Sequence, residues 1–231
     1  YNEVTDLKNM YKIMKSYYAQ DGASFYAIGI PMLESVKLLK SGGMEREAEE
    51  LLRYYEIHGE MLIKNGLCYP PHEVKYEQSI VAPAVNYLFQ LYELTGKILY
   101  LEEGKKQLAV LVLFNGHQPD FHMYENAVRH WDGYWFGKYK NLGDTFPHYW
   151  SSLSGVAFRE YEKITGERSY GVKAENSLRG VLSMINSDGS ASCAYVYPFM
   201  VNNVRCQYAD PWANDQDWAL YYYLKEGKNY D

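Results

Sequence analysis

Cysteine, long apolar segments and clustered basic residues are all scarce in this sequence. Its three cysteines form no closely spaced pair, so they indicate neither a disulfide framework nor a zinc motif. The longest apolar run, Leu108–Phe114, is far shorter than the roughly 20 residues that span a bilayer. The 23 basic residues are outnumbered by 29 acidic ones and form no cluster. We therefore expect no membrane span and no nucleic-acid partner.

Tyrosine, by contrast, is abundant. The chain has 25 Tyr, 8 Phe and 5 Trp, and its aromatic fraction is 16%. Such rings can stack on the faces of sugars while their polar groups bond to sugar hydroxyls. The composition, 47% hydrophobic and 23% charged, is otherwise that of a globular domain. These features favour a folded protein that binds carbohydrate.

Helical periodicity dominates the chain and predicts eight helices. Thr5 is the expected cap of the first helix, and Pro83 is expected to kink the fourth helix or to move its start. An alternating run, Ser190–Tyr197, predicts a short β-ribbon that returns through Asn202 and Asn203. The expected helices are 4–18, 31–41, 44–64, 76–94, 98–114, one ending at Thr165, 168–185, and one starting at Asn214.

Two of the expected helix connections share a sequence. Tyr92–Tyr100 and Tyr161–Tyr170 both contain Thr-Gly followed by a tyrosine at the start of the return helix. Further along, Leu108 and Leu111 match Leu178 and Val181 at the same offset of 70 residues. The similarity indicates two copies of one helical hairpin, and the segment after Gly42 is a weaker third copy.

The segment 115–149 separates the two hairpins and lacks helical periodicity. A long irregular segment inside a compact domain usually carries function. We therefore interpret 115–149 as a functional insert within a single domain that covers residues 1–231.

Repeated hairpins with Thr-Gly connectors and aromatic loops resemble the (α/α) toroids of six-hairpin glycosidases and of several polysaccharide lyases. The stretches His130–Lys138 and Gly143–Trp150 look like active-site loops of bacterial members that act on uronic-acid glycans. The resemblance implies an all-α, helical-hairpin toroid with a small β-ribbon. It also implies an oligosaccharide or polysaccharide substrate and no cofactor. Because four hairpins are fewer than six, we expect the chain to be the C-terminal part of a larger enzyme.

Glycoside hydrolysis is the first expected activity, since it needs two carboxyl groups. Asp132 is the leading general acid, because neighbouring Trp131, Tyr134 and Trp135 could form a sugar platform and raise the pKa of a carboxyl group. Its expected partner is Asp144 or Glu77. Asp132 precedes Gly133, so a turn-forming role competes with the catalytic one.

Several side chains near these carboxyl groups could bind an anionic sugar. Arg129 can bond to a carboxylate through two parallel hydrogen bonds, and Lys138 supplies a second positive charge. The complete predicted set of substrate-binding residues is Arg129, His130, Trp131, Tyr134, Trp135, Lys138 and Trp150.

Two alternatives stay open. A polysaccharide lyase would use His148 or Tyr149 to remove the proton beside a uronate carboxylate, while a cation stabilises the developing charge. A non-catalytic module would use the aromatics only for glycan binding. His117, Asp120, His122 and His130 fit no zinc signature, so no metal is predicted. A secreted or periplasmic location is favoured over a cytoplasmic one.

Overall fold

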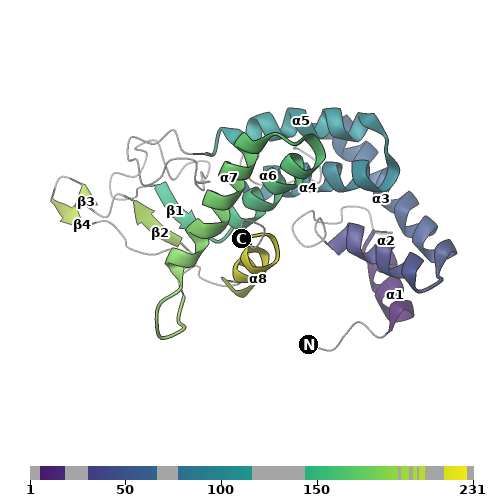
Figure 1. Ribbon diagram of the computed structural model, residues 1–231, viewed down its shortest axis with the longest axis horizontal. Coiled ribbons are helices and arrows are strands. Elements are labelled where there is room, and N and C mark those ends of the chain that lie inside the picture. The colour runs from purple at the N-terminus through teal and green to yellow at the C-terminus, as the bar shows by residue number, and fades with distance from the viewer. Residues whose placement is uncertain are drawn as a thin grey trace. The chain divides into compact units, whose positions relative to one another are not determined.

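A computed structural model describes residues 6–18, 31–66, 78–115, 144–191, 194–197, 200–201, 203–205 and 216–227. Eight α-helices dominate these residues, and two small two-stranded sheets accompany them (Figure 1). The predicted fold class, all-α and built from the helical hairpins of (α/α) toroids, is confirmed. The helices are α1 Leu7–Tyr18, α2 Pro31–Ser41, α3 Glu45–Asn65, α4 Gln78–Thr95, α5 Ile98–Val112, α6 Ser151–Thr165, α7 Arg168–Gly180 and α8 Gln216–Glu226.

The helix boundaries follow the predicted ones to within a few residues, and the helix predicted over 168–185 ends at Gly180, where the 3₁₀ segment Val181–Met184 takes over. Asp6 caps α1 by accepting a hydrogen bond from the backbone N–H of Asn9 at 2.9 Å, whereas Thr5 lies outside the described residues. Pro83 lies inside α4, and the predicted start at Tyr76 lies outside the described residues. None of the helices in the described ranges is long and apolar enough to cross a bilayer.

The chain divides into two compact units. One contains residues 1–73 and 83–107, and the other contains residues 74–82 and 108–231. In the first unit, buried side chains of α2, α3 and α4 form the core, among them Leu39, Leu51 and Leu88. Two tyrosines place polar groups in this core: Tyr55 shares a hydrogen bond of 2.8 Å with Ser35, and Tyr87 donates to the Tyr55 carbonyl. The buried hydroxyls are thus satisfied, as burial requires.

The second unit contains the α6–α7 hairpin, α8, the 3₁₀ segment η4 (Val181–Met184) and the strands. Residues Ser151–Arg159 of α6 are all buried, so this half of the helix is enclosed by other parts of the protein. Gly155 permits the close packing of α7, because a Cβ atom there would lie 2.6 Å from Leu178 Cγ. A side chain at position 155 would force the two helices apart.

The predicted β-ribbon is present, but its pairing is different. Strand β2 (Ala194–Tyr197) pairs antiparallel with β1 (Asp144–His148), which the sequence placed in the irregular insert. A separate hairpin joins β3 (Met200–Val201) to β4 (Val204–Arg205) through Asn203, which has a positive φ of 64°. The sequence did not predict β1, because proline cannot donate a ladder hydrogen bond and so argues against strand structure.

A β-bulge accommodates Pro147 in β1. Thr145 pairs with Val196 and His148 pairs with Ala194, so β1 advances three residues while β2 advances two. Bulges leave one residue without a ladder partner, which is where proline is tolerated. The strand can therefore include Pro147 and still pair on both sides of it.

Candidate functional site

The candidate site is the end of the insert, where β1 leads into α6. Only residue 115 and residues 144–149 of the insert are described. The other predicted site residues lie outside the described residues: Glu77, Arg129, His130, Trp131, Asp132, Tyr134, Trp135 and Lys138. The same holds for the metal candidates that the sequence did not support, His117, Asp120 and His122. The roles predicted for the first group stay predictions.

The bulge changes the register positions of two candidates. In an uninterrupted strand, Asp144 and His148 would occupy the same face, because alternate residues share a face. The observed pairing instead puts His148 opposite Ala194 and Thr145 opposite Val196, and Ala194 and Val196 are alternate residues of β2. His148 therefore shares a register face with Thr145, whereas Asp144, opposite Tyr197, belongs to the other face.

Tyr149 directly follows β1 and is buried, with 8% of its surface exposed. Its cluster contains Val181 and Met184 of η4 and Ala219 of α8, all at most 2% exposed. Trp150 packs edge-on against the Tyr149 ring, with ring centroids 5.4 Å apart, and is half-buried. Tyr149 thus packs in the core of the second unit, and its catalytic role stays a prediction.

The turn from Tyr149 into α6 is held by the backbone. The Tyr149 carbonyl accepts hydrogen bonds from the Ser152 backbone N–H at 3.2 Å and from its hydroxyl at 2.7 Å. The Leu153 N–H donates to the Trp150 carbonyl at 3.0 Å. His148, the last residue of β1, therefore directly precedes the hydrogen-bonded turn into α6.

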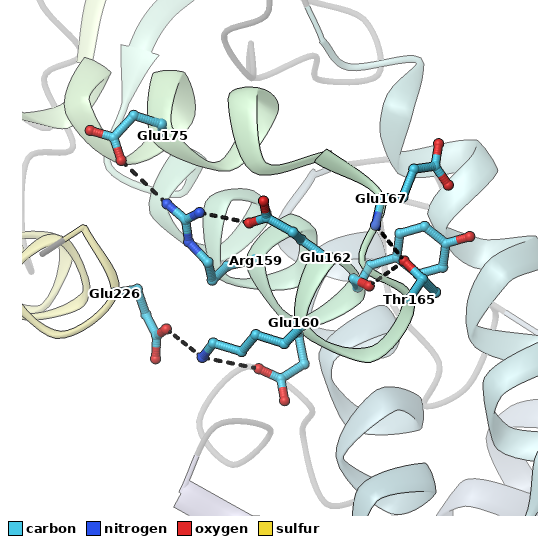
Figure 2. Close-up of polar contacts among 9 residues, drawn as sticks. Arg159, Glu160, Glu162, Thr165, Glu167, Glu175 and Glu226 are labelled. Atoms are coloured by element: carbon cyan, nitrogen blue, oxygen red, sulfur yellow. Dashed lines mark hydrogen bonds and ion pairs between the residues drawn. The ribbon is translucent and has the colours of Figure 1, made fainter. Parts of the chain in front are cut away.

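Ion pairs join α6 to α7 and to α8 (Figure 2). The Arg159 side chain, only 4% exposed, pairs with Glu162 at 2.8 Å and with Glu175 of α7 at 3.3 Å. Gly171 makes room for the Glu162 carboxylate, since a Cβ atom at position 171 would lie 2.1 Å from its oxygen. The Arg159 charge is therefore matched inside the α6–α7 hairpin, which indicates a structural role rather than a substrate-binding one.

Within the described part of the chain, His, Cys, Asp and Glu residues form no group of three that could hold a metal ion. The sequence did not identify the support that η4 and α8 give to Tyr149. The apolar positions of those segments were visible, but periodicity alone cannot tell which distant segment packs on which.

The folding pattern defines the class: an all-α protein of helical hairpins that carries a small β-ribbon beside its candidate site. No protein-family model matches the chain, and no curated protein matches it. Among solved structures it is similar to Polysaccharide Lyase BACCELL_00875, with 50% sequence identity over 96% of this chain and a TM-score of 0.81. The match covers 33% of that chain, so the present sequence spans about a third of its length.

The similarity to this lyase agrees with part of the family resemblance that the sequence predicted. It supports the carbohydrate-active side of the prediction and its (α/α) toroid fold. It favours the lyase alternative over the hydrolase that the sequence placed first. The hydrolase roles of Asp132, Asp144 and Glu77 have no support from the comparison.

Proposed function

We propose that the chain is part of a polysaccharide lyase that cleaves uronate-containing glycans by β-elimination. The observation that carries the proposal is the 50% identity to a polysaccharide lyase over nearly the whole chain. The richness in tyrosine and the absence of a basic cluster agree with a sugar substrate rather than a nucleic acid.

The chemistry defines what the site must supply. A base removes the proton on the carbon beside the uronate carboxylate, and that electron pair forms a carbon–carbon double bond. The glycosidic carbon–oxygen bond at the neighbouring carbon breaks, and the leaving oxygen takes up a proton. The intermediate is anionic, so a cation or hydrogen-bond donor near the carboxylate lowers the barrier.

Within this proposal His148 is the base. A neutral imidazole can accept a proton near neutral pH, and the histidine backbone is anchored between the bulged strand and the start of α6. The burial of Tyr149 favours a packing role and makes it the weaker candidate. Arg129 is assigned to the uronate carboxylate, since its planar guanidinium can bond to both oxygens.

The two reaction classes differ in their products. Elimination creates a double bond conjugated to the carboxylate, which absorbs ultraviolet light, while hydrolysis creates a reducing end without that double bond. We would incubate the protein with a panel of uronate-containing polysaccharides and measure ultraviolet absorbance and reducing ends in the same samples. Reducing ends with matching absorbance support the lyase, and reducing ends alone would establish a hydrolase. Glycan binding without either product would indicate the non-catalytic module.

A further inference from the structure

One face of α8 makes two kinds of contact in the second unit. Ala219 and Tyr223 belong to the cluster around Tyr149, and Glu226 pairs with Lys163 of α6 at 2.8 Å. These three α8 residues are spaced four and three apart, which places them on one stripe of the helix. The stripe that packs in the Tyr149 cluster therefore continues into the ion pair with α6.

The Lys163 side chain is 44% exposed, but the carboxylate that it pairs with is shielded, and a second shielded carboxylate lies near it. The Glu226 side chain is 12% exposed and that of Glu160 13%, and Lys163 lies 3.8 Å from Glu160 (Figure 2). Lys163 thus neutralises two carboxylates that have little access to water. Without its charge, the two carboxylates would repel each other where α8 meets α6, because shielded charges are poorly screened by solvent.

We infer that α8 is a brace for the active site, and that Lys163 and Glu226 are positioning residues for the proposed base. The ion pair fixes α8 against α6, Ala219 and Tyr223 then hold Tyr149, and Tyr149 fixes the backbone of the adjacent His148. The inference rests on the proposed function for its catalytic consequence. Its structural step, from the ion pair to the Tyr149 turn, stands on the contacts alone.

The test uses Lys163→Met, Glu226→Gln and the conservative Lys163→Arg in the 231-residue protein. Lys105→Met serves as the matched control, because Lys105 forms an ion pair of 3.0 Å with Glu102 within α5 and belongs to the other compact unit. Two quantities are measured for each variant: hydrogen exchange of the Ser152 and Leu153 amides, and kcat and KM for elimination. The two amides are chosen because they donate to the Tyr149 and Trp150 carbonyls.

We expect Lys163→Met to speed exchange at both amides and to lower kcat by about tenfold with little change in KM, since displacements of about 1 Å can cost about 100-fold in rate. Glu226→Gln should act in the same direction, and Lys163→Arg should restore both readouts. The Lys105→Met protein should behave like the wild type. A purely stabilising ion pair would lower the melting temperature and leave kcat of the folded protein unchanged, which would overturn the inference.

The outcome also separates the inference from the proposed function. A wild-type protein without elimination activity would contradict the proposed function, and the amide exchange would then decide the brace alone. If both amides exchange at the wild-type rate in Lys163→Met and Glu226→Gln, α8 does not hold the Tyr149 turn, whatever the reaction is. If exchange rises in active variants while kcat stays constant, the turn does not position the base.

Discussion

Thr165 makes, at the end of α6, the same hydrogen bonds that Thr95 makes at the end of α4. Each hydroxyl donates to the carbonyl four residues earlier, at 2.6 Å for Thr95 and 2.7 Å for Thr165, and accepts the N–H two residues later. The glycine after each threonine has a positive φ, 67° at Gly96 and 74° at Gly166. The repeated sequence is therefore a repeated structure, which caps the first helix and turns the chain into the second.

The glycine in this connector gives the first prediction. Gly166→Ala should lower the free energy of unfolding by about 1–2 kcal/mol, because a Cβ atom disfavours the left-handed conformation. A Cβ at position 166 would meet no atom within 4 Å, so conformational strain alone should cause the loss. The measurement is urea unfolding, with Val172→Ala on exposed α7 surface as the control. An unchanged stability in Gly166→Ala would show that the connector tolerates a different backbone conformation.

Arg159 gives the second prediction. Replacing it with Met should destabilise the protein by about 3–5 kcal/mol, because two partly shielded carboxylates, Glu162 and Glu175, would lose their common cation. Arg179 offers a matched control, since it also pairs with Glu175 but its side chain is 66% exposed. Arg179→Met should change stability by less than about 1 kcal/mol. Equal losses for the two variants in urea unfolding would contradict the distinction between buried and exposed pairs.

Hydrophobic periodicity and glycine positions were sufficient to predict the helices. The Thr-Gly repeat predicted the connectors at Gly96 and Gly166 because local hydrogen bonds determine that turn. The weaker copy at Gly42 differs: Met44 N–H bonds to the Leu39 carbonyl and Gly43 N–H to the Lys40 carbonyl, which is a Schellman motif. The β1–β2 pairing was not predictable in the same way, because it joins segments far apart in sequence and includes Pro147.

The third prediction concerns pH and the attachment of α1 to α3. Lys15 donates to Glu50 at 2.8 Å, and the Tyr11 hydroxyl also donates to Glu50. The hydrogen bonds from Lys15 and then Tyr11 lower the pKa of Glu50 below its ordinary 4.5, and hydrogen bonding to Glu50 raises the pKa of Lys15 and of Tyr11. Because the pKa of Glu50 is lower in the folded protein than in the unfolded chain, the Glu50 carboxylate stabilises the fold at pH values above its ordinary pKa. This stabilisation is lost as the pH falls through the lowered pKa of the folded protein.

Raised pKa values of Lys15 and Tyr11 have the opposite sign. Their stabilisation is present below the ordinary values of 10.5 and 10.0 and is lost as pH rises through the folded values. The gap in melting temperature between wild type and Glu50→Gln should therefore be largest near neutral pH and close at both extremes. Glu49→Gln, at an exposed neighbouring position, should show no such profile. A constant gap across pH would contradict the assignment.

The candidate site was predictable only in part, for physical reasons. The lack of helical periodicity identified the insert, and its aromatic and charged residues suggested sugar binding. The role of each residue depends on burial and register, which sequence spacing does not determine. Tyr149 was a candidate base by residue type, whereas its burial in a cluster with residues of η4 and α8 was not visible in the sequence. The bulge at Pro147 changed the register of His148 relative to Asp144, and a one-residue change of this kind moves a residue to the other face.

The last prediction separates His148 from Tyr149. His148→Gln should reduce kcat for elimination by about 100-fold or more while the melting temperature stays near that of the wild type, since a general base contributes about 10²–10⁴-fold. Tyr149→Phe keeps the buried ring and should retain kcat within about threefold of the wild type. A threefold loss corresponds to a rise in the activation barrier of less than the roughly 1.36 kcal/mol that a tenfold loss requires. Tyr149→Ala should instead destabilise the protein by about 3–5 kcal/mol through loss of ring packing.

These variants should be assayed on one polysaccharide, with ultraviolet absorbance, reducing ends and melting temperature measured on the same preparations. If Tyr149→Phe is folded but inactive and His148→Gln is active, Tyr149 is the base. The comparison is direct because each variant removes one polar group from the wild-type protein. Activity in both variants, with reducing ends but no absorbance, would return the catalytic role to carboxyl groups.

Asp132→Asn would then be the decisive variant. A general acid supplies its proton only as the glycosidic bond breaks, so the loss of Asp132 should lower kcat without weakening glycan binding.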